Sequence, residues 1–260
     1  MQLIGKTALI SGAASGIGKA TALTFVSEGA QVLLGDINFD RAEKLARSIG
    51  ENAQAVPLDV SSENSWRGTL ADVERNPGHL DILVNCAGIG IAGNFEETSL
   101  ADWQNVIDVN LTSVFLGCKY GLPLLRNAPG DASIINISSI AGLVGGEDIA
   151  AYSASKGGVT MLTKSVALHC GQHAKNVRCN SVHPTYVNSE MLDPVEEQFS
   201  SREEMLQGMA QEVPIGRVAE PQDIADMILF LASNNARMVT GAQMLVDGGQ
   251  LAGLPAKHST

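Results

Sequence analysis

The chain has 260 residues, 45% of them hydrophobic and 17% charged, a composition that supports one sizeable core and argues against disorder. Its net charge of −11 argues against a nucleic acid or an anionic membrane surface as a partner. Four scattered cysteines without zinc spacing, no signal-peptide pattern and no apolar run of membrane-spanning length predict a cytoplasmic protein without a metal site or membrane anchor.

Short β-branched runs alternate with longer helical patterns along the chain. The predicted strands are residues 7–11, 31–35, 53–58, 80–85, 133–138, 177–182 and 243–246. The predicted helices are residues 17–28, 39–49, 62–76, 100–125, 152–173 and 221–232. This alternation predicts an α/β fold, a doubly wound parallel sheet with helices on both faces, as a single domain over residues 1–260. Residues 184–216 interrupt the rhythm and are expected to form a small helical flap.

A glycine-rich loop follows the first predicted strand and opens the first helix. It reads Ser11-Gly12-Ala13-Ala14-Ser15-Gly16-Ile17-Gly18. Gly12 permits a tight turn, Gly16 allows a pyrophosphate to approach the backbone, and Gly18 allows close packing of helix on strand. The free N–H groups and the dipole of the helix N-terminus favour an anion. A dinucleotide site is therefore predicted, with an ordinary βα turn as the alternative.

The ends of the next strands carry further candidate cofactor residues. Asp36 ends the second strand, where its carboxylate can accept hydrogen bonds from both ribose hydroxyls and repels a 2′-phosphate. Ile37 and Asn38 follow, so no adjacent Arg or Lys is there to neutralise a phosphate, and NAD is favoured over NADP. Asp59-Val60 and Asn85-Cys86-Ala87-Gly88 end the third and fourth strands and fall on the same rim of the sheet.

Tyr152 and Lys156 are spaced to share one face of a helix, and Ser139 precedes the tyrosine by thirteen residues. A free phenol has a pKa near 10, and an ammonium beside it favours the phenolate. A serine hydroxyl can donate a hydrogen bond to a substrate oxygen on which charge develops. These three side chains predict a proton-transfer site for an alcohol/ketone pair. Before the loop is considered, a surface Tyr–Lys pair is the alternative.

These motifs resemble the short-chain dehydrogenase/reductase family over nearly the whole chain. The glycine loop, Asp59, residues 85–88, Asn110, Ser139, Tyr152, Lys156 and Pro184 stand in the family's order and at its spacings. The resemblance implies a Rossmann-like domain with a seven-stranded sheet, usually assembled as a homotetramer. It also implies a catalytic tetrad of Asn110, Ser139, Tyr152 and Lys156, with Asn110 at a break in its helix and holding a water that links Lys156 to solvent. Val246-Asp247-Gly248-Gly249 resembles the family's last strand and its exit.

The cofactor expected from the motifs and the resemblance is NAD. The expected cofactor-binding residues are Gly12, Ser15, Gly16, Ile17, Gly18, Asp36, Asp59, Val60, Asn85, Ala87, Gly88, Tyr152, Lys156, Pro184, Val187 and Ser189. Three positions depart from the family pattern: Cys86 replaces a frequent Asn, Thr185 replaces the Gly after Pro184, and Ser189 replaces a common Thr. They put the local loop geometry in question but leave the chemistry in place.

The predicted flap is apolar and rich in methionine, which suits a bulky, weakly polar secondary alcohol or ketone. The motifs are most similar to bacterial hydroxysteroid and cyclic-alcohol dehydrogenases. Packing of the flap or a subunit interface would explain the same composition. His183 is expected to pack in the core, with a contact to substrate as the alternative. A 3-oxoacyl-thioester reductase, normally NADPH-dependent, and a non-catalytic nucleotide sensor remain the alternative functions.

Overall fold

A computed structural model describes residues 1–91 and 93–253 of the chain. The strands are β1 (Thr7–Ser11), β2 (Gln31–Asp36), β3 (Ala53–Pro57), β4 (Ile82–Asn85), β5 (Ala132–Ile137), β6 (Val177–Pro184) and β7 (Gln243–Val246). The helices are α1 (Gly16–Ser27), α2 (Phe39–Ile49), α3 (Glu63–Arg75), α4 (Leu100–Ile107), α5 (Ser113–Arg126), α6 (Ala150–His173), α7 (Asp193–Glu196), α8 (Arg202–Ala210) and α9 (Pro221–Ala232). A π-helical segment, η1 (Asp108–Thr112), joins α4 to α5.

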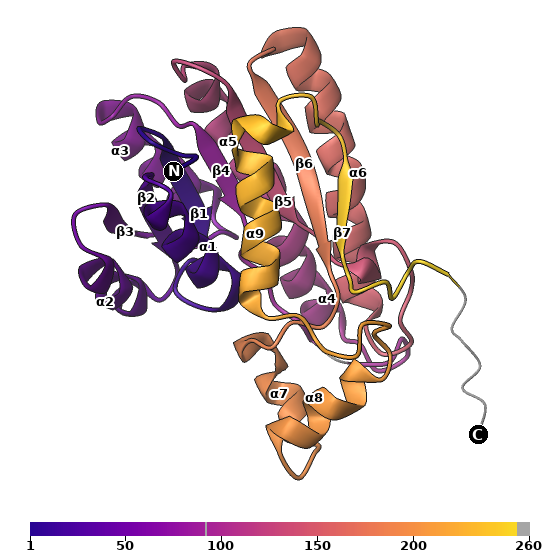
Figure 1. The fold of residues 1–260 in the computed structure, drawn as a ribbon. Helices are drawn as coiled ribbons and strands as arrows, with labels where there is room; N and C mark the ends of the chain where they lie inside the picture. Colours follow the sequence, from indigo (N-terminus) through magenta and orange to yellow (C-terminus); the bar gives the residue numbers. More distant parts are fainter. Residues whose placement is uncertain (92, 254–260) are drawn as a thin grey trace.

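The seven strands form one parallel sheet in the order β3-β2-β1-β4-β5-β6-β7. The chain crosses from one half of the sheet to the other between β3 and β4, as in a doubly wound fold. Helices α7 and α8 stand apart from the sheet and the helices that flank it, beyond the end of the sheet at which β6 finishes (Figure 1). The predicted α/β class, the seven strands and the Rossmann-like topology are confirmed.

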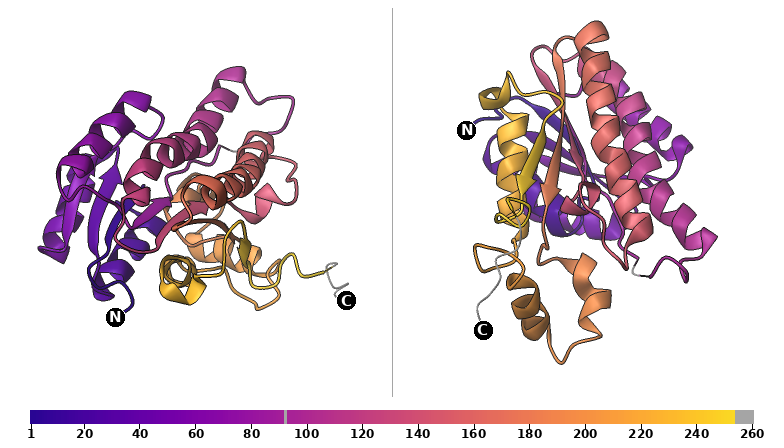
Figure 2. Two further views of the ribbon diagram at one scale, coloured as in Figure 1. Left: turned by 90° about the horizontal axis from the view of Figure 1, so that it is seen from above. Right: turned by 90° about the vertical axis from the view of Figure 1, so that its right-hand side faces the viewer.

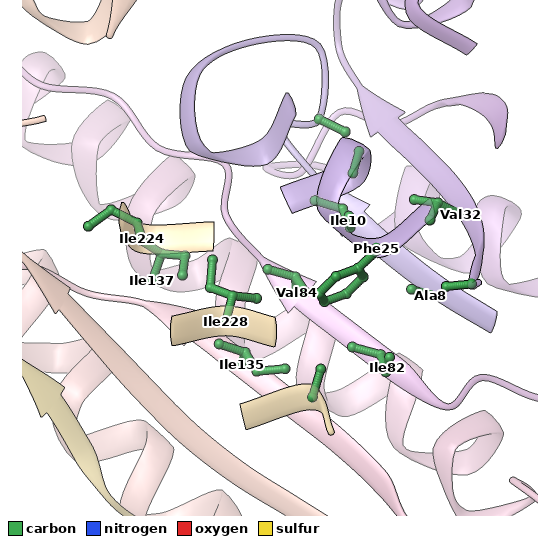
Figure 3. Packing of buried hydrophobic residues seen from close by; sticks show 14 of the residues in the cluster. Ala8, Ile10, Phe25, Val32, Ile82, Val84, Ile135, Ile137, Ile224 and Ile228 are labelled. Carbon is green, nitrogen blue, oxygen red and sulfur yellow. The ribbon is translucent and has the colours of Figure 1, made fainter. Parts of the chain in front are cut away.

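Successive strand residues enter two cores because a strand turns alternate side chains to opposite faces. Ile10 and Val84 pack with α1, α2 and α9 on one face, while Leu9 and Leu83 pack with α3, α5 and α6 on the other. The two helix layers flank the sheet in Figure 2. In Figure 3, Phe25 of α1 lies near Val84 at the centre of the first core.

The element boundaries differ from the predicted ones by a few residues. Strand β4 begins at Ile82, two residues later than predicted, because the N–H of Leu80 donates to Leu124 O in α5 and not to a neighbouring strand. The predicted helix over residues 100–125 is divided by η1, with Asn110 in the break, as expected from the family resemblance. The predicted flap over residues 184–216 contains a 3₁₀ turn, η3 (Glu190–Leu192), as well as α7 and α8.

No helix among the described residues has both the length and the apolar character needed to cross a bilayer. Within the same residues, no group of three or more metal-ligating side chains is gathered.

Candidate active site

The candidate site lies at the carboxyl ends of the strands, where the connections diverge. β1 is flanked by β2 and β4 in the sheet, and the chain leaving β1 enters α1 on one face. The chain leaving β4 continues instead to α4, which contacts α6 on the opposite face. Ligands of open α/β sheets bind in the crevice between such diverging connections.

The glycine loop is fixed by close backbone packing against the end of β4. Gly12 has a φ of +67°, and a Cβ there would lie 2.8 Å from Ala87 Cα. A Cβ at Gly18 would lie 2.1 Å from Gly12 O. Ser11 Oγ accepts hydrogen bonds from Cys86 N–H and Ala87 N–H at 3.0 and 3.2 Å, joining the two strand ends. Glycine is therefore required at both positions.

The loop presents hydrogen-bond donors to an anion. Gly16 is the first residue of α1, and its N–H donates to a carboxylate oxygen of Glu190 at 3.1 Å. Ser15 is the N-cap of α1, yet its hydroxyl makes no capping hydrogen bond, and Ile17 packs against the first core. A negatively charged oxygen already occupies this helix N-terminus, so the residues present fit the phosphates of a dinucleotide.

Asp36 links the glycine loop to the end of β2. Its Oδ2 accepts from Ala14 N–H and its Oδ1 accepts from Asn38 N–H, both at 2.9 Å. These two bonds orient the carboxylate at the junction of the loop with β2. Asp36 thus has the expected place beside the loop, at the side where the ribose of a nucleotide would lie.

The candidate residues at the ends of β3 and β4 have different environments. Asp59 accepts from Ser61 N–H and from its hydroxyl at 3.0 and 2.7 Å, which organises the turn that follows β3. Val60 is buried at the start of this turn. The amide of Asn85 donates to Asn136 Oδ1 at 2.8 Å inside the molecule. Because its side chain is buried there, Asn85 has only its backbone to offer to a cofactor.

Asn110 is buried in the π-helical segment and closes one side of the site. Its amide is paired in both directions with the backbone of Ile89, with N···O distances of 2.8 and 2.9 Å, and it also donates to Ser155 Oγ at 3.2 Å. A Cβ at Gly88 would lie 3.3 Å from Asn110 Oδ1 and 3.4 Å from Lys156 Nζ. Gly88 therefore leaves the space in which these two side chains approach each other.

Ser139, Tyr152 and Lys156 meet where the end of β5 faces α6. Lys156 Nζ donates to Ile137 O at 2.9 Å and lies 5.6 Å from the centroid of the Tyr152 ring. The Ser139 side chain lies beside the phenol of Tyr152, close enough to lower its pKa. The structure thus brings all four predicted catalytic residues together. Asn110 comes from η1, Ser139 from the turn after β5, and Tyr152 and Lys156 from α6.

Burial dominates the ionisation of this cluster. It raises the pKa of Tyr152 above its usual 10, and the neighbouring Ser139 side chain offsets only part of that shift. It lowers the pKa of Lys156 to about 8. Cys86 lies close by, and burial raises the pKa of its thiol to about 12. At neutral pH the free protein therefore holds a phenol, an ammonium and a thiol, whereas the sequence had favoured a phenolate.

The chain matches, over residues 12–250, a family model described as enoyl-(acyl carrier protein) reductase. An NADP-dependent (R)-specific alcohol dehydrogenase of Lentilactobacillus kefiri is 39% identical and aligns over 96% of this chain and 98% of its own. A 3-alpha-(or 20-beta)-hydroxysteroid dehydrogenase of Mycobacterium tuberculosis is 40% identical, and the alignment covers 97% of this chain and 92% of that protein. The solved structure of an aldohexose dehydrogenase of Thermoplasma acidophilum superposes with a TM-score of 0.89 at 31% identity. The superposition covers 99% of this chain and 98% of that one.

The chain belongs to the short-chain dehydrogenase/reductase family. It is an enzyme, an oxidoreductase that uses a nicotinamide cofactor to interconvert an alcohol and a carbonyl compound. The resemblance drawn from the sequence is thereby confirmed.

The segment after β6 runs past the glycine loop without needing a glycine at Thr185. None of the non-glycine residues in 1–91 and 93–253 has a positive φ, so Thr185 adopts an ordinary backbone conformation. Its N–H donates to Val246 O at 3.2 Å, and Val187 forms a bridge with Ala219. The Cβ of Ser189 lies 3.3 Å from where a Gly16 Cβ would be. Ser189 therefore lies beside the glycine loop.

The two arginines of the flap region are engaged within the protein. Arg202 donates to Asn188 Oδ1, to Ser189 O and to the carboxylates of Asp193 and Glu196, at 2.7–2.9 Å. The other, Arg217, forms a two-pronged ion pair with the carboxylate of helix α9's Asp223. Arg202 holds the start of the flap together, so these cations are already paired and do not present themselves to a substrate carboxylate.

Sequence reasoning missed the role of three side chains around this site. His183 is fully buried, with Nδ1 3.0 Å from Ser139 O and Nε2 2.8 Å from Ser181 Oγ. Packing of His183 was the favoured interpretation, but its bond to the catalytic serine depends on the β5–β6 pairing. Glu190 and Arg41, which form an ion pair at the glycine loop, are far apart in sequence. The one feature of the sequence that could have marked Glu190 as part of the site is its position next to Ser189, a predicted cofactor residue.

Proposed function

We propose that this enzyme oxidises a bulky, weakly polar secondary alcohol, such as a hydroxysteroid or another cyclic alcohol, with NAD. The observation that carries the proposal is the convergence of Asn110, Ser139, Tyr152 and Lys156 beside a glycine loop that accepts an anion. Hydroxysteroid dehydrogenase activity in a 40% identical relative supports the substrate class.

The chain's own residues supply proton transfer and orientation. Ser139 donates a hydrogen bond to the substrate oxygen, and Tyr152 exchanges a proton with that oxygen. Lys156 is held by Ile137 O and keeps a positive charge near the phenol below a pH of about 8. Asn110, in the π-helical segment, would hold a water that links Lys156 to solvent. A bound nicotinamide would supply the hydride acceptor or donor.

The protonation state of Tyr152 determines how the rate in each direction depends on pH. As a phenol it can protonate a ketone oxygen, and as a phenolate it can take the proton of an alcohol. Because burial raises its pKa, alcohol oxidation is expected to accelerate with rising pH on the alkaline side, while ketone reduction is fastest near neutrality. Rates in both directions, measured from pH 6 to 10, check this sign.

The preference for NAD rests on the Asp36 carboxylate. Its bonds to Ala14 N–H and Asn38 N–H aim a negative charge at the loop, which disfavours a 2′-phosphate. Against this, Lys19, Arg41 and Lys44 line a hollow of about 240 Å³ beside Ala14. These cations, and the NADP-dependent relative, favour the alternative of an NADPH-dependent reductase, including a 3-oxoacyl-thioester reductase.

A paired assay separates these functions. NADH and NADPH formation are followed against hydroxysteroids, cyclic alcohols and short aliphatic alcohols, and their oxidation against a 3-oxoacyl thioester. Turnover of a bulky secondary alcohol with NAD supports the proposal, whereas thioester reduction with NADPH alone would replace it. Tyr152→Phe should bind NADH as the wild type does and lose turnover. Activity of that variant within tenfold of wild type would remove Tyr152 from the mechanism.

We extend the proposal to assembly and location. Exposed apolar side chains on α4, α5 and α6, namely Trp103, Phe115, Met161 and Leu168, support a homotetramer that covers this face. Light scattering after size exclusion tests the subunit number. The four unpaired cysteines are compatible with a reducing cytoplasm, which cell fractionation would test.

A further inference from the structure

Glu190 lies on the glycine loop with both carboxylate oxygens engaged. Its Oε2 accepts from Gly16 N–H at 3.1 Å, and its Oε1 is ion-paired with the guanidinium of Arg41 on α2. Arg202 fixes the segment that carries Glu190 by donating to Ser189 O at 2.7 Å. The flap, the loop and α2 thus meet at one carboxylate.

This carboxylate occupies a donor that a dinucleotide needs. Gly16 N–H is the first amide of α1, at the end of the helix where the dipole stabilises an anionic oxygen. A carboxylate and a phosphate are both anionic oxygen acceptors, and a single N–H cannot fully serve both. A phosphate that approached Gly16 with Glu190 in place would also face like-charge repulsion.

Arg41 is the second part of the same arrangement. Its backbone N–H is fixed by the Asn38 cap at 3.1 Å, so the side chain starts from a defined position in the first turn of α2. The guanidinium reaches the same carboxylate that Gly16 binds. Any anion that takes the place of this carboxylate therefore meets the same guanidinium, whose fork of donors suits phosphate oxygens.

We infer that Gly16 and Arg41 form a phosphate subsite which Glu190 fills in the free enzyme and from which the cofactor displaces it. Glu190 is thus an internal competitor that weakens cofactor binding, and Arg41 is a ligand of the cofactor phosphate once Glu190 has left. The inference rests on the proposed function only in requiring a nicotinamide dinucleotide at the glycine loop. The phosphate can be the pyrophosphate, common to NAD and NADP, or the 2′-phosphate of NADP.

The first experiment measures NADH binding by fluorescence titration. Glu190→Gln keeps the shape of the side chain and removes its charge, so this variant should bind NADH about tenfold more tightly, the usual scale for one charged hydrogen bond. Glu190→Ala should behave in the same way. Glu197→Gln, which makes the same change at an exposed flap residue, should stay within about twofold of wild type by the usual weakness of exposed charges. Thermal melts confirm that all variants fold.

Two smaller probes identify what Glu190 competes with. ADP carries a pyrophosphate and adenosine carries none, so Glu190→Gln should tighten ADP binding and leave adenosine unchanged. Arg41→Met in the Glu190→Gln background should weaken the binding of phosphate-bearing ligands. An equal loss for NADH and NADPH assigns Arg41 to the pyrophosphate, and a loss for NADPH alone assigns it to the 2′-phosphate.

The outcomes that would overturn the inference are distinct from failure of the proposed function. Unchanged or weaker NADH binding by both Glu190 variants would show that the carboxylate does not compete. Equal tightening of adenosine and ADP would show that Glu190 acts by narrowing the cleft and not as an anion. A wild-type protein that binds neither NADH nor NADPH would overturn the dinucleotide function and the subsite together.

Discussion

Replacing Lys156 by methionine should make the protein inactive and more stable. The Lys156 side chain is 3% exposed, and its Nζ donates to Ile137 O at 2.9 Å. Burial lowers its pKa from 10.5 to about 8. A shift of this direction means that the folded state disfavours the charged lysine, so catalysis is maintained here at the expense of stability.

The size of the effect follows from that pKa. At neutral pH the lysine is protonated in both states, and each pKa unit corresponds to about 1.4 kcal/mol, so the shift destabilises the fold by about 3 kcal/mol. Methionine removes the charge but also leaves Ile137 O without this donor, which costs about 1 kcal/mol. We therefore expect Lys156→Met to be about 2 kcal/mol more stable at pH 7.

The pH dependence has a definite sign. Since the folded pKa is below the unfolded one, the folded state loses the Lys156 proton first as pH rises through about 8, while the unfolded state keeps it to about 10.5. In this window the unfolded state binds more protons, so wild-type stability rises relative to the variant. The difference should narrow by about 1 kcal/mol between pH 7 and pH 9.

Urea unfolding at one fixed protein concentration, without cofactor, measures both quantities. Lys175→Met serves as the control because Lys175 is exposed and its variant should differ from wild type by less than about 0.5 kcal/mol. A Lys156→Met protein less stable than wild type at pH 7 would refute the reasoning. A stability difference that widens from pH 7 to pH 9 would refute it equally.

Three further substitutions test the site. His183→Leu should lower kcat about tenfold and leave NADH affinity unchanged, because the hydrogen-bond donor to Ser139 O is lost. His183→Asn should recover much of the lost kcat. A kcat of the leucine variant equal to that of the wild type would contradict this role. Gly88→Ala should lower kcat by about tenfold or more, since the added Cβ would lie 3.4 Å from Lys156 Nζ. Unchanged kinetics would show that the neighbouring side chains move to accept the methyl group. Asp36→Asn should reduce the ratio of NAD to NADP efficiency by about tenfold, measured as kcat/KM for each.

The sequence was sufficient for features that depend on near neighbours in the chain. Alternating strand and helix patterns predicted the seven strands to within a few residues, because periodicity and turn residues act locally. The loop from Gly12 to Gly18 was readable because its glycines are spaced within one turn. The boundaries were less accurate where long-range bonds decide them, as at Leu80, whose N–H is taken by Leu124 O.

The ionisation of the site could not be read from the residue types. Proximity of Lys156 to Tyr152 predicted a phenolate, but the depth of burial reverses that expectation in the free protein. Likewise, no Arg or Lys follows Asp36 directly, yet the fold places Lys19, Arg41 and Lys44 beside Ala14. Desolvation and the field of distant charges exist only once the layers have packed.

By itself, the sequence determined the α/β class, the position of the glycine loop and the pairing of Tyr152 with Lys156 on one helix. Each of these features depends on residues that are close together in the chain. Only the tertiary structure decided that His183 bonds Ser139 and that Glu190 stands between Gly16 and Arg41. Those contacts join residues separated by 44 to 174 positions, so they arise from the order of strands in the sheet and from the position of the flap at the carboxyl end of β6.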